Sequence, residues 1–165
     1  MFGGQYLPNF SGYIRDHLNT DLDHEFNAQE EMQNITPSII NHDFLTELGT
    51  ENFSRRSFMK VERIMHSHGA CLQEVWELRN TRFERFADMI LYPRNTEDCQ
   101  QLVTLAHKHN VVLVPYGGGT NVTKSLMLSP KETRMIVSVD MGRCNQVKWV
   151  DKENNMASVQ AGIMG

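Results

Sequence analysis

The chain has 165 residues, of which 40% are hydrophobic, and its 16 basic and 20 acidic residues give a formal net charge of −4. These values fit one ordinary domain or part of one, and the slight acidic excess gives a nucleic-acid partner no electrostatic support. No apolar stretch approaches the roughly 20 residues needed to cross a bilayer. The cysteines, Cys71, Cys99 and Cys144, form no Cys-x-x-Cys pair, which favours a reducing compartment and small core residues over disulfides or zinc.

The first 56 residues are polar, and we expect them to form an N-terminal extension that is partly irregular. Within it, residues 44–48 are predicted to form a short helix, with Asn41 or Asp43 as its N-cap and Gly49 as its end.

Residues 57–87 are expected to be a helical lead-in to the rest of the chain. From position 57 to about 79, apolar residues recur at three- and four-residue steps, which predicts an amphipathic helix that can break at Gly69. The predicted stripe consists of Val61, Ile64, Met65, His68, Leu72, Val75 and Trp76.

Beyond Arg85 the pattern is that of a strand, a helix, a second strand and then a run of strands, which indicates an α+β or mixed α/β fold. The segments DMILY and VVLVP are predicted as buried strands, and NTEDCQQLVTLAHKHN as the helix between them. Asn95 or Thr96 is its expected cap. Its expected buried stripe is Cys99, Leu102, Val103 and Ala106. The later strand candidates are RMIVSVD, CNQVKWVD and MASVQAG.

The most informative motif is VPYGGGTNV at residues 114–122. Three consecutive glycines are costly inside a helix or strand, but after a strand their amides can bind phosphate oxygens without side-chain obstruction. The spacing matches neither the P-loop nor the GxGxxG motif. The residues alone therefore leave two interpretations open, an anion-binding cradle and a plain surface turn.

Other polar residues near these segments are weaker candidates for a site. His66, His68 and Cys71 do not share one helix face and have no fourth ligand, so we expect no metal site. His68 is expected to pack in the structure, with a place near an active site as the alternative. Arg94 and Lys124 flank the glycine loop and could neutralise a pyrophosphate, although solvated surface charge is the favoured interpretation. Tyr116 could stack on a ligand or only shape the loop.

Residues 88–165 resemble the opening of the FAD-binding domain of the vanillyl-alcohol oxidase and p-cresol methylhydroxylase family. The resemblance lies in DMILYPRNTEDCQQLVTLAHKHNVVLVPYGGGTNV and in IVSVDMGRCNQVKWVDKENNMASVQAG, which ends in the Ala-Gly that this family places near the flavin. It implies FAD as cofactor, with the pyrophosphate against the glycine loop. The implied cofactor-binding residues are Pro115, Tyr116, Gly117, Gly118, Gly119, Thr120 and Asn121.

Two residues of this loop, Thr120 and Asn121, differ from those that some members of the family carry there. Members that attach flavin covalently often carry a His directly after the glycines, where this chain has Thr120, so a non-covalent FAD is implied. Asn121 stands where Ser is more familiar, a change that keeps a polar side chain.

Farther upstream, SHGACLQEVWELRNTRFERFADMILYPRNTED and TPSIINHDFLTEL resemble the alkylglycerone-phosphate synthase family of ether-lipid synthesis. This implies a peroxisomal flavoenzyme, peripheral to the membrane and homodimeric, that exchanges the acyl chain of acylglycerone phosphate for a long-chain fatty alcohol. FAD would act there through its N5 atom without net redox change. On this basis we expect residues 88–165 to be the first part of the domain, with no catalytic residue in the chain and no activity from it alone. The alternative is an FAD-linked 2-hydroxyacid dehydrogenase of the D-lactate or glycolate type.

Overall fold

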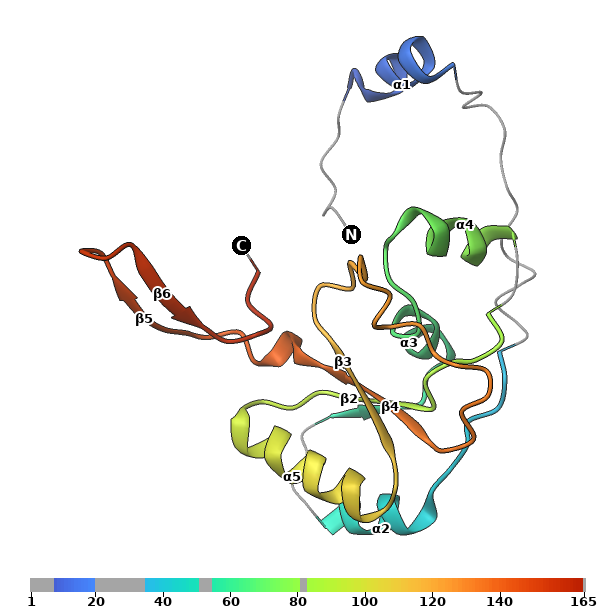
Figure 1. The fold of residues 1–165 in the computed structure, drawn as a ribbon, viewed down its shortest axis with the longest axis vertical. Helices are drawn as coiled ribbons and strands as arrows, with labels where there is room; N and C mark the ends of the chain where they lie inside the picture. Colours follow the sequence, from blue (N-terminus) through green and yellow to red (C-terminus); the bar gives the residue numbers. More distant parts are fainter. Residues whose placement is uncertain (1–7, 20–34, 51–54, 81–82, 165) are drawn as a thin grey trace. The chain divides into compact units, whose positions relative to one another are not determined.

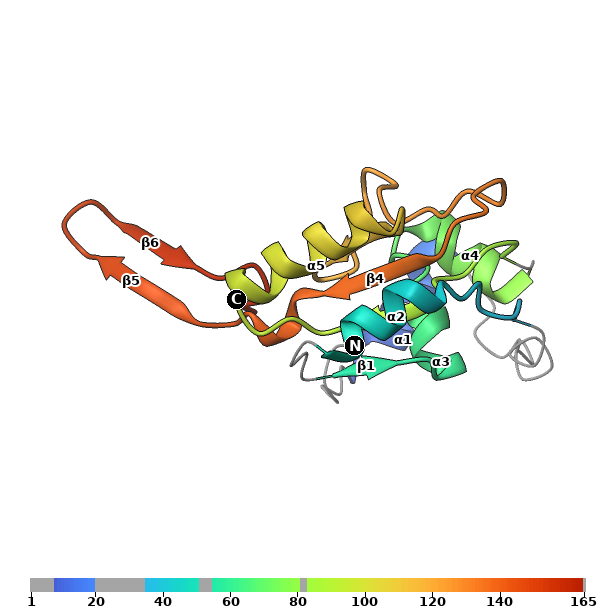
Figure 2. The same ribbon diagram turned by 90° about the horizontal axis from the view of Figure 1, so that it is seen from below.

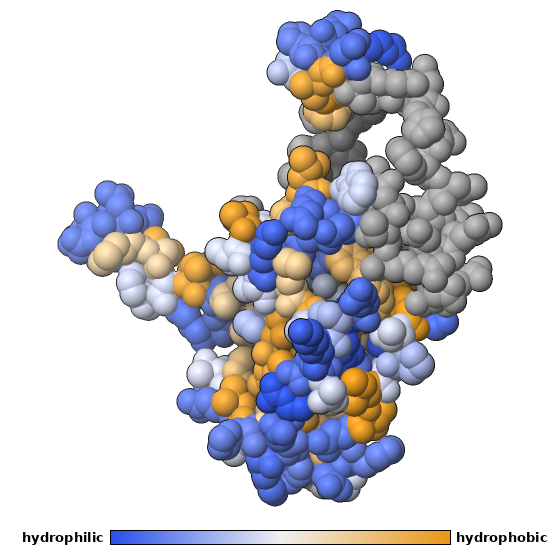
Figure 3. All heavy atoms as spheres, turned by 45° about the vertical axis from the view of Figure 1, so that its right-hand side comes forward, coloured by the Kyte–Doolittle hydropathy of each residue, from blue (hydrophilic) through white to orange (hydrophobic). Residues whose placement is uncertain are grey.

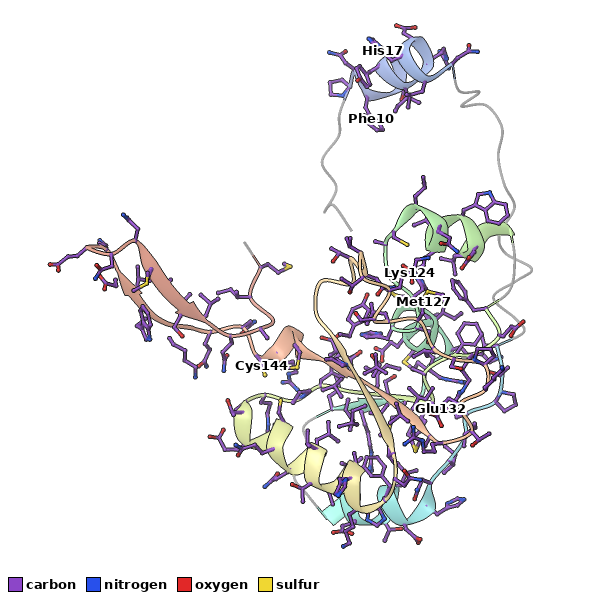
Figure 4. The ribbon with its side chains drawn as sticks, in the orientation of Figure 1. Phe10, His17, Lys124, Met127, Glu132 and Cys144 are labelled. Atoms are coloured by element: carbon purple, nitrogen blue, oxygen red, sulfur yellow. The ribbon has the colours of Figure 1, made fainter. Side chains whose placement is uncertain are left out.

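The computed structural model describes residues 8–19, 35–50, 55–80 and 83–164. Its contacts divide the chain into two units, residues 1–30 and residues 31–165. In the first unit, helix α1 (Phe10–Leu18) ends at Asn19, which adopts a left-handed conformation with φ of 48°. The Tyr13 and His17 rings stack one turn apart on this helix, with centroids separated by 4.3 Å. His17 is labelled in Figure 4.

The second unit is built on a four-stranded sheet in the order β1-β2-β4-β3 (Figure 1). The strands are β1 (Arg56–Ser57), β2 (Met89–Leu91), β4 (Ile136–Asp140) and β3 (Val112–Tyr116). Strands β2, β4 and β3 are parallel, and β1 joins β2 in the antiparallel direction. Because α5 connects the parallel strands β2 and β3, the mixed α/β fold class expected from the sequence is confirmed.

Helix α5 (Thr96–Lys108) begins where the sequence predicts, because the Asn95 side chain accepts a hydrogen bond from the Asp98 amide at 2.8 Å. The predicted buried stripe is partly wrong. Leu102 and Ala106 are buried as expected, but Leu105 fills the place assigned to Val103, which is 59% exposed. Cys99 is half-buried. The stripe is therefore rotated, because the helix faces both the sheet and α2.

Helix α2 (His42–Thr50) packs against α5, and Figure 1 shows the two helices below the strands. Its expected N-cap is confirmed for Asn41, whose Oδ1 accepts a hydrogen bond from the Phe44 amide at 2.9 Å. The helix includes Gly49 instead of ending there. Phe44 and Leu48 of α2 are fully buried. They pack in the main core with residues of α5 and of the strands. This core consists of Phe44, Leu48, Met89, Leu91, Leu102, Leu105, Ala106, Val111, Met135, Val137 and Val139. Figure 3 shows a mostly hydrophilic surface over this end of the unit.

The predicted long helix after residue 57 is two helices, α3 (Lys60–Met65) and α4 (Leu72–Asn80). The break near Gly69 is confirmed, and a Cβ on Gly69 would lie 2.0 Å from the Cβ of Asn121, so two segments cross there in close contact. The predicted apolar stripe is wrong as a buried face. Ile64 is buried, but exposed members of that stripe are Val61, Met65, Leu72 and Trp76. In their place, polar side chains are buried: Arg63, His66, Ser67 and Glu74.

Strand β3 is an edge strand, and its residues are partly exposed, contrary to the buried strand expected from its apolar composition. Strand β4 lies between β2 and β3, and its residues Ile136 to Val139 are buried. Two further strands confirm the sequence prediction: β5 (Val147–Asp151) and β6 (Met156–Val159) form an antiparallel hairpin of their own. Figure 2 shows this hairpin extending away from the four-stranded sheet.

The Asp88 carboxylate joins three distant parts of the chain at the start of β2. It is fully buried and forms a bidentate ion pair with Arg85. It also accepts hydrogen bonds from the Ile39 amide at 2.8 Å and the Ile136 amide at 2.7 Å. A buried carboxylate needs such compensation, and here Asp88 attaches the segment before α2 to the sheet. Within the described ranges, no helix combines the length and apolar character needed to span a membrane.

Candidate functional site

The glycine loop leaves the sheet at the carboxyl end of β3. Tyr116 is the last residue of β3 paired with β4, opposite Asp140, and the chain then turns away through Gly117 to Gly119. The carboxyl ends of the parallel strands β2, β4 and β3 share this edge. In open α/β sheets this is the edge at which ligands bind.

The three glycines have two different roles. A Cβ on Gly117 or Gly118 would meet no atom within 4 Å, and both residues are exposed. Gly119 has φ of +67°, and a Cβ there would lie 2.4 Å from the Tyr116 hydroxyl oxygen. Gly119 is thus required by the turn itself, whereas Gly117 and Gly118 leave open space above an accessible backbone.

Asn121 anchors the far end of this loop. It is buried and has φ of 54°, a conformation that Asn tolerates better than most residues. Its Nδ2 donates to Glu74 Oε1 at 2.6 Å, and its Oδ1 accepts from the Leu126 amide at 2.8 Å. Both functions of the side-chain amide are therefore engaged within the protein.

Glu74 of α4 is the partner that sequence reasoning missed. It is 2% exposed and also accepts a hydrogen bond from the Gly69 amide at 2.9 Å. Burial acts to raise the pKa of this carboxyl, but its hydrogen bonds outweigh burial and the pKa lies below its usual value. An ionised carboxylate thus ties α4 to the glycine loop. The sequence offers no signal for this pairing because Glu74 and Asn121 are 47 positions apart.

The Tyr116 ring packs beneath the loop against His66, with ring centroids 4.5 Å apart. Burial, helped by the charges of Asp140 and Glu74, raises the pKa of the Tyr116 phenol. His66 is 7% exposed, and its Nε2 lies 2.7 Å from Asp140 Oδ2 at the end of β4. Of the two sequence interpretations for Tyr116, the side chain takes the loop-shaping position against Gly119.

The other residues singled out from the sequence lie at or near the same edge. Pro115 is paired with Val139 in the sheet, and the Thr120 side chain is exposed. Lys124, labelled in Figure 4, donates to Gln73 Oε1 of α4 at 2.9 Å.

Arg94 and His68 also have partners within the protein. Arg94 forms an ion pair with Asp98 at 2.9 Å. His68 stacks on Phe83, with centroids 5.7 Å apart. In the part of the chain that the structure describes, no group of three or more His, Cys, Asp or Glu side chains is placed to hold a metal ion.

The Ala-Gly pair after β6 returns to the end of β4. The Gly162 amide donates to the Cys144 carbonyl at 2.8 Å, and a Cβ on Gly162 would lie 1.8 Å from the Met141 carbonyl oxygen. Cys144, labelled in Figure 4, follows the short 3-10 helix Met141–Arg143 that comes after β4. Gly162 is thus required by close backbone approach, and it lies by the carboxyl end of the strand next to β3.

The chain is similar to proteins of known family and structure. Residues 87–165 match the family model described as FAD binding domain. Alkyldihydroxyacetonephosphate synthase of Trypanosoma brucei brucei is 33% identical over 141 residues, which are 83% of this chain and 23% of that protein. A solved structure of alkyldihydroxyacetonephosphate synthase has 34% identity and a TM-score of 0.82 over 96% of this chain and 30% of its own.

A more distant relative is the mitochondrial D-lactate dehydrogenase [cytochrome] of Kluyveromyces lactis, 31% identical over 77 residues, 46% of this chain and 13% of that protein. The similarity to the synthases therefore extends over a larger part of this chain. The chain spans less than a third of the length of the synthases that it matches.

Proposed function

We propose that this chain, which belongs to the alkyldihydroxyacetonephosphate synthase family, supplies part of the FAD-binding domain of an ether-lipid-forming flavoenzyme. The observation that carries the proposal is the pair Gly117 and Gly118, whose missing side chains leave open space at the ligand-binding edge of a parallel sheet. A pyrophosphate fits this position because backbone amides can approach its oxygens closely there.

The residues proposed to hold FAD are those of the loop and its two anchors. The backbone of Gly117 to Thr120 would bind the pyrophosphate, while Tyr116 and Asn121 keep the turn in shape through their contacts with Gly119 and Glu74. When bound, FAD would supply the reactive flavin ring, and this chain's own residues would hold and orient it. Residues 88–165 would be the first part of the domain, with 57–87 as its lead-in and 1–56 as an extension.

The proposed reaction of the full-length protein is the exchange of the acyl chain of acylglycerone phosphate for a long-chain fatty alcohol. A 2-hydroxyacid dehydrogenase activity is the alternative. It is less favoured because a glycolate oxidase subunit is 28% identical over 70% of this chain and a D-lactate dehydrogenase 31% identical over 46%, both less than the 33% identity over 83% for the synthase. We place the enzyme in the peroxisome, as a homodimer bound peripherally to the membrane. Product analysis after incubation with acylglycerone phosphate and hexadecanol tests the exchange, and oxidation of D-lactate with no ether product would contradict it. Residues 1–165 alone are expected to be inactive.

The glycine loop gives the most direct test of FAD binding. Gly118→Val in the full-length protein should abolish flavin retention, because the new side chain enters the space proposed for the pyrophosphate, where a Cβ meets no protein atom within 4 Å. Bound FAD is measured by absorbance after gel filtration, and folding by circular dichroism. Gly49→Val is the matched control, since a Cβ at Gly49 in α2 also meets no atom within 4 Å. A Gly118→Val protein that retains stoichiometric FAD would overturn the assignment.

The mode of attachment is a separate prediction. Thr120 occupies the position after the glycines, and its hydroxyl can hydrogen-bond but cannot form a histidyl linkage to the flavin. Precipitation of the holoprotein with trichloroacetic acid should therefore release all of the yellow flavin into the supernatant. Flavin that stays with the pellet after washing would show covalent attachment instead.

A further inference from the structure

The His66 ring lies between two hydrogen-bond acceptors. Its Nδ1 is 2.8 Å from the Glu62 carbonyl oxygen, one turn earlier in the chain, and its Nε2 is 2.7 Å from Asp140 Oδ2. A carbonyl oxygen can only accept a hydrogen bond, so Nδ1 must carry a proton. The protonation of Nε2 then depends on the charge of Asp140.

Asp140 is itself placed as an acceptor. Its Oδ1 accepts a hydrogen bond from the Gly142 amide at 2.7 Å. Burial acts to raise the pKa of this carboxyl, but the hydrogen bonds from His66 and from the Gly142 amide outweigh burial, and the pKa lies below its usual value. An ionised carboxylate only accepts, so Nε2 must donate as well. A ring that donates from both nitrogens is an imidazolium.

This cation lies against the aromatic ring that supports the glycine loop. The His66 and Tyr116 centroids are 4.5 Å apart, within the range of a cation–π contact. The Tyr116 hydroxyl oxygen in turn lies 2.4 Å from the position that a Cβ of Gly119 would take, so the two residues are in close contact. A continuous series of contacts therefore runs from Asp140 through His66 and Tyr116 to the Gly119 turn.

The other charged and titratable side chains around this series have partners of their own. On the β2 side, the Tyr92 ring meets His66 edge-on at 6.0 Å, and the Arg55 guanidinium lies over that ring at 4.5 Å. The Glu62 side chain is paired with Arg55. Burial, reinforced by the charge of Glu62, raises the pKa of Tyr92 to about 12, so this phenol is neutral. Glu74, which acts electrostatically on Tyr116, is held by Asn121.

We propose that His66 is a positioning residue of the flavin site: as an imidazolium clamped between the Glu62 carbonyl and Asp140, it holds Tyr116 and the Gly119 turn in the shape that binds the FAD pyrophosphate. Loss of one proton from His66 leaves one of the two acceptors without a donor and removes the charge under Tyr116. FAD affinity therefore falls when this proton is lost at higher pH. This inference rests on the proposed function of the loop.

The test compares FAD binding by the full-length apoprotein and two variants, using flavin fluorescence from about pH 6 to about pH 9. The wild type should lose roughly tenfold in affinity over this range. His66→Arg keeps a permanent cation with several donors, so its FAD affinity should stay near the low-pH value of the wild type and change little with pH. His66→Gln has no charge and should bind FAD weakly at every pH.

Two further measurements separate positioning from simple packing. The ring ¹⁵N signals of His66, recorded by NMR on the apoprotein, should show both nitrogens protonated at the lower pH. Tyr116→Leu should remove the pH dependence, because His66 acts through this ring. A neutral His66 ring at low pH, or wild-type FAD binding that does not change with pH, overturns the inference and leaves the proposed function intact. Wild-type protein that binds no FAD at any pH overturns both.

Discussion

The Asn121 side chain connects two segments at a point where the backbone turns left-handed. Its amide donates to the buried Glu74 carboxylate and accepts from the Leu126 amide, so each end of the side chain has a partner of the correct polarity. Ser, the more familiar residue here in the family that the chain resembles, has a side chain one atom shorter, with a single oxygen in place of two separate polar atoms. The two hydrogen bonds therefore require Asn at this position, because its side chain both donates and accepts.

Asn121→Asp should destabilise the chain by roughly 1–3 kcal/mol, because a second carboxylate would face Glu74 and the donated hydrogen bond would be lost. The free energy of unfolding, measured by urea titration, checks this. Val122→Asp is the matched control, since Val122 is 84% exposed and the same charge there should change stability by less than about 0.5 kcal/mol. Equal losses in the two variants would contradict the role given to Asn121.

At the scale of elements, the start of helix α5 could be predicted from its sequence, but its buried face could not. Its start is a local matter, since Asn95 caps the Asp98 amide three residues later, and the sequence predicted it correctly. Its buried face depends on α2 and β3, which come from distant parts of the chain. Periodicity therefore predicted Val103 where Leu105 is buried.

The same difference between local and long-range contacts explains which parts of the site could be predicted. The glycine loop could be predicted because its three glycines are contiguous in sequence. The contacts that shape it could not, because His66 meets Asp140 across 74 positions and Glu74 meets Asn121 across 47. The helix α3–α4 region was misread for a related reason: its buried residues are polar side chains with distant partners, which an apolar period does not detect.

Leu102→Ala in α5 should destabilise the chain by about 2–5 kcal/mol, because Leu102 is 1% exposed and its loss leaves a cavity against α2 and the sheet. Val103→Ala, on the exposed side of the same helix, should cost less than about 0.5 kcal/mol. Chemical denaturation of the two variants measures the difference. If Val103→Ala were the more harmful change, the orientation of α5 would be wrong.

For the whole molecule, carboxylates with a lowered pKa contribute to the response to acid. The hydrogen bond from Arg94 lowers the pKa of the Asp98 carboxyl, and that of Asp140 is lowered as well. A carboxyl whose pKa is lower in the folded state contributes stability above its unfolded-state value of 3.8, and this contribution is lost as the pH falls through the folded-state value. Both groups therefore stabilise the fold near neutral pH.

The melting temperature, followed by circular dichroism, should accordingly fall steeply as the pH drops from about 5 to below about 4. Asp98→Asn should melt at a lower temperature near neutral pH and lose less on acidification, because one of the linked protons is absent. A variant with the same acid profile as the wild type would show that Asp98 does not contribute.

The attachment of residues 35–41 through Asp88 has a consequence for amide hydrogen exchange. One carboxylate accepts from the Ile39 amide in that segment and from the Ile136 amide at the start of β4. The first amide is released whenever the segment peels away from the sheet, whereas the second also requires separation of the central strand. Exchange at Ile39 should therefore be faster, and the protection factor of the Ile39 amide gives the free energy of local detachment.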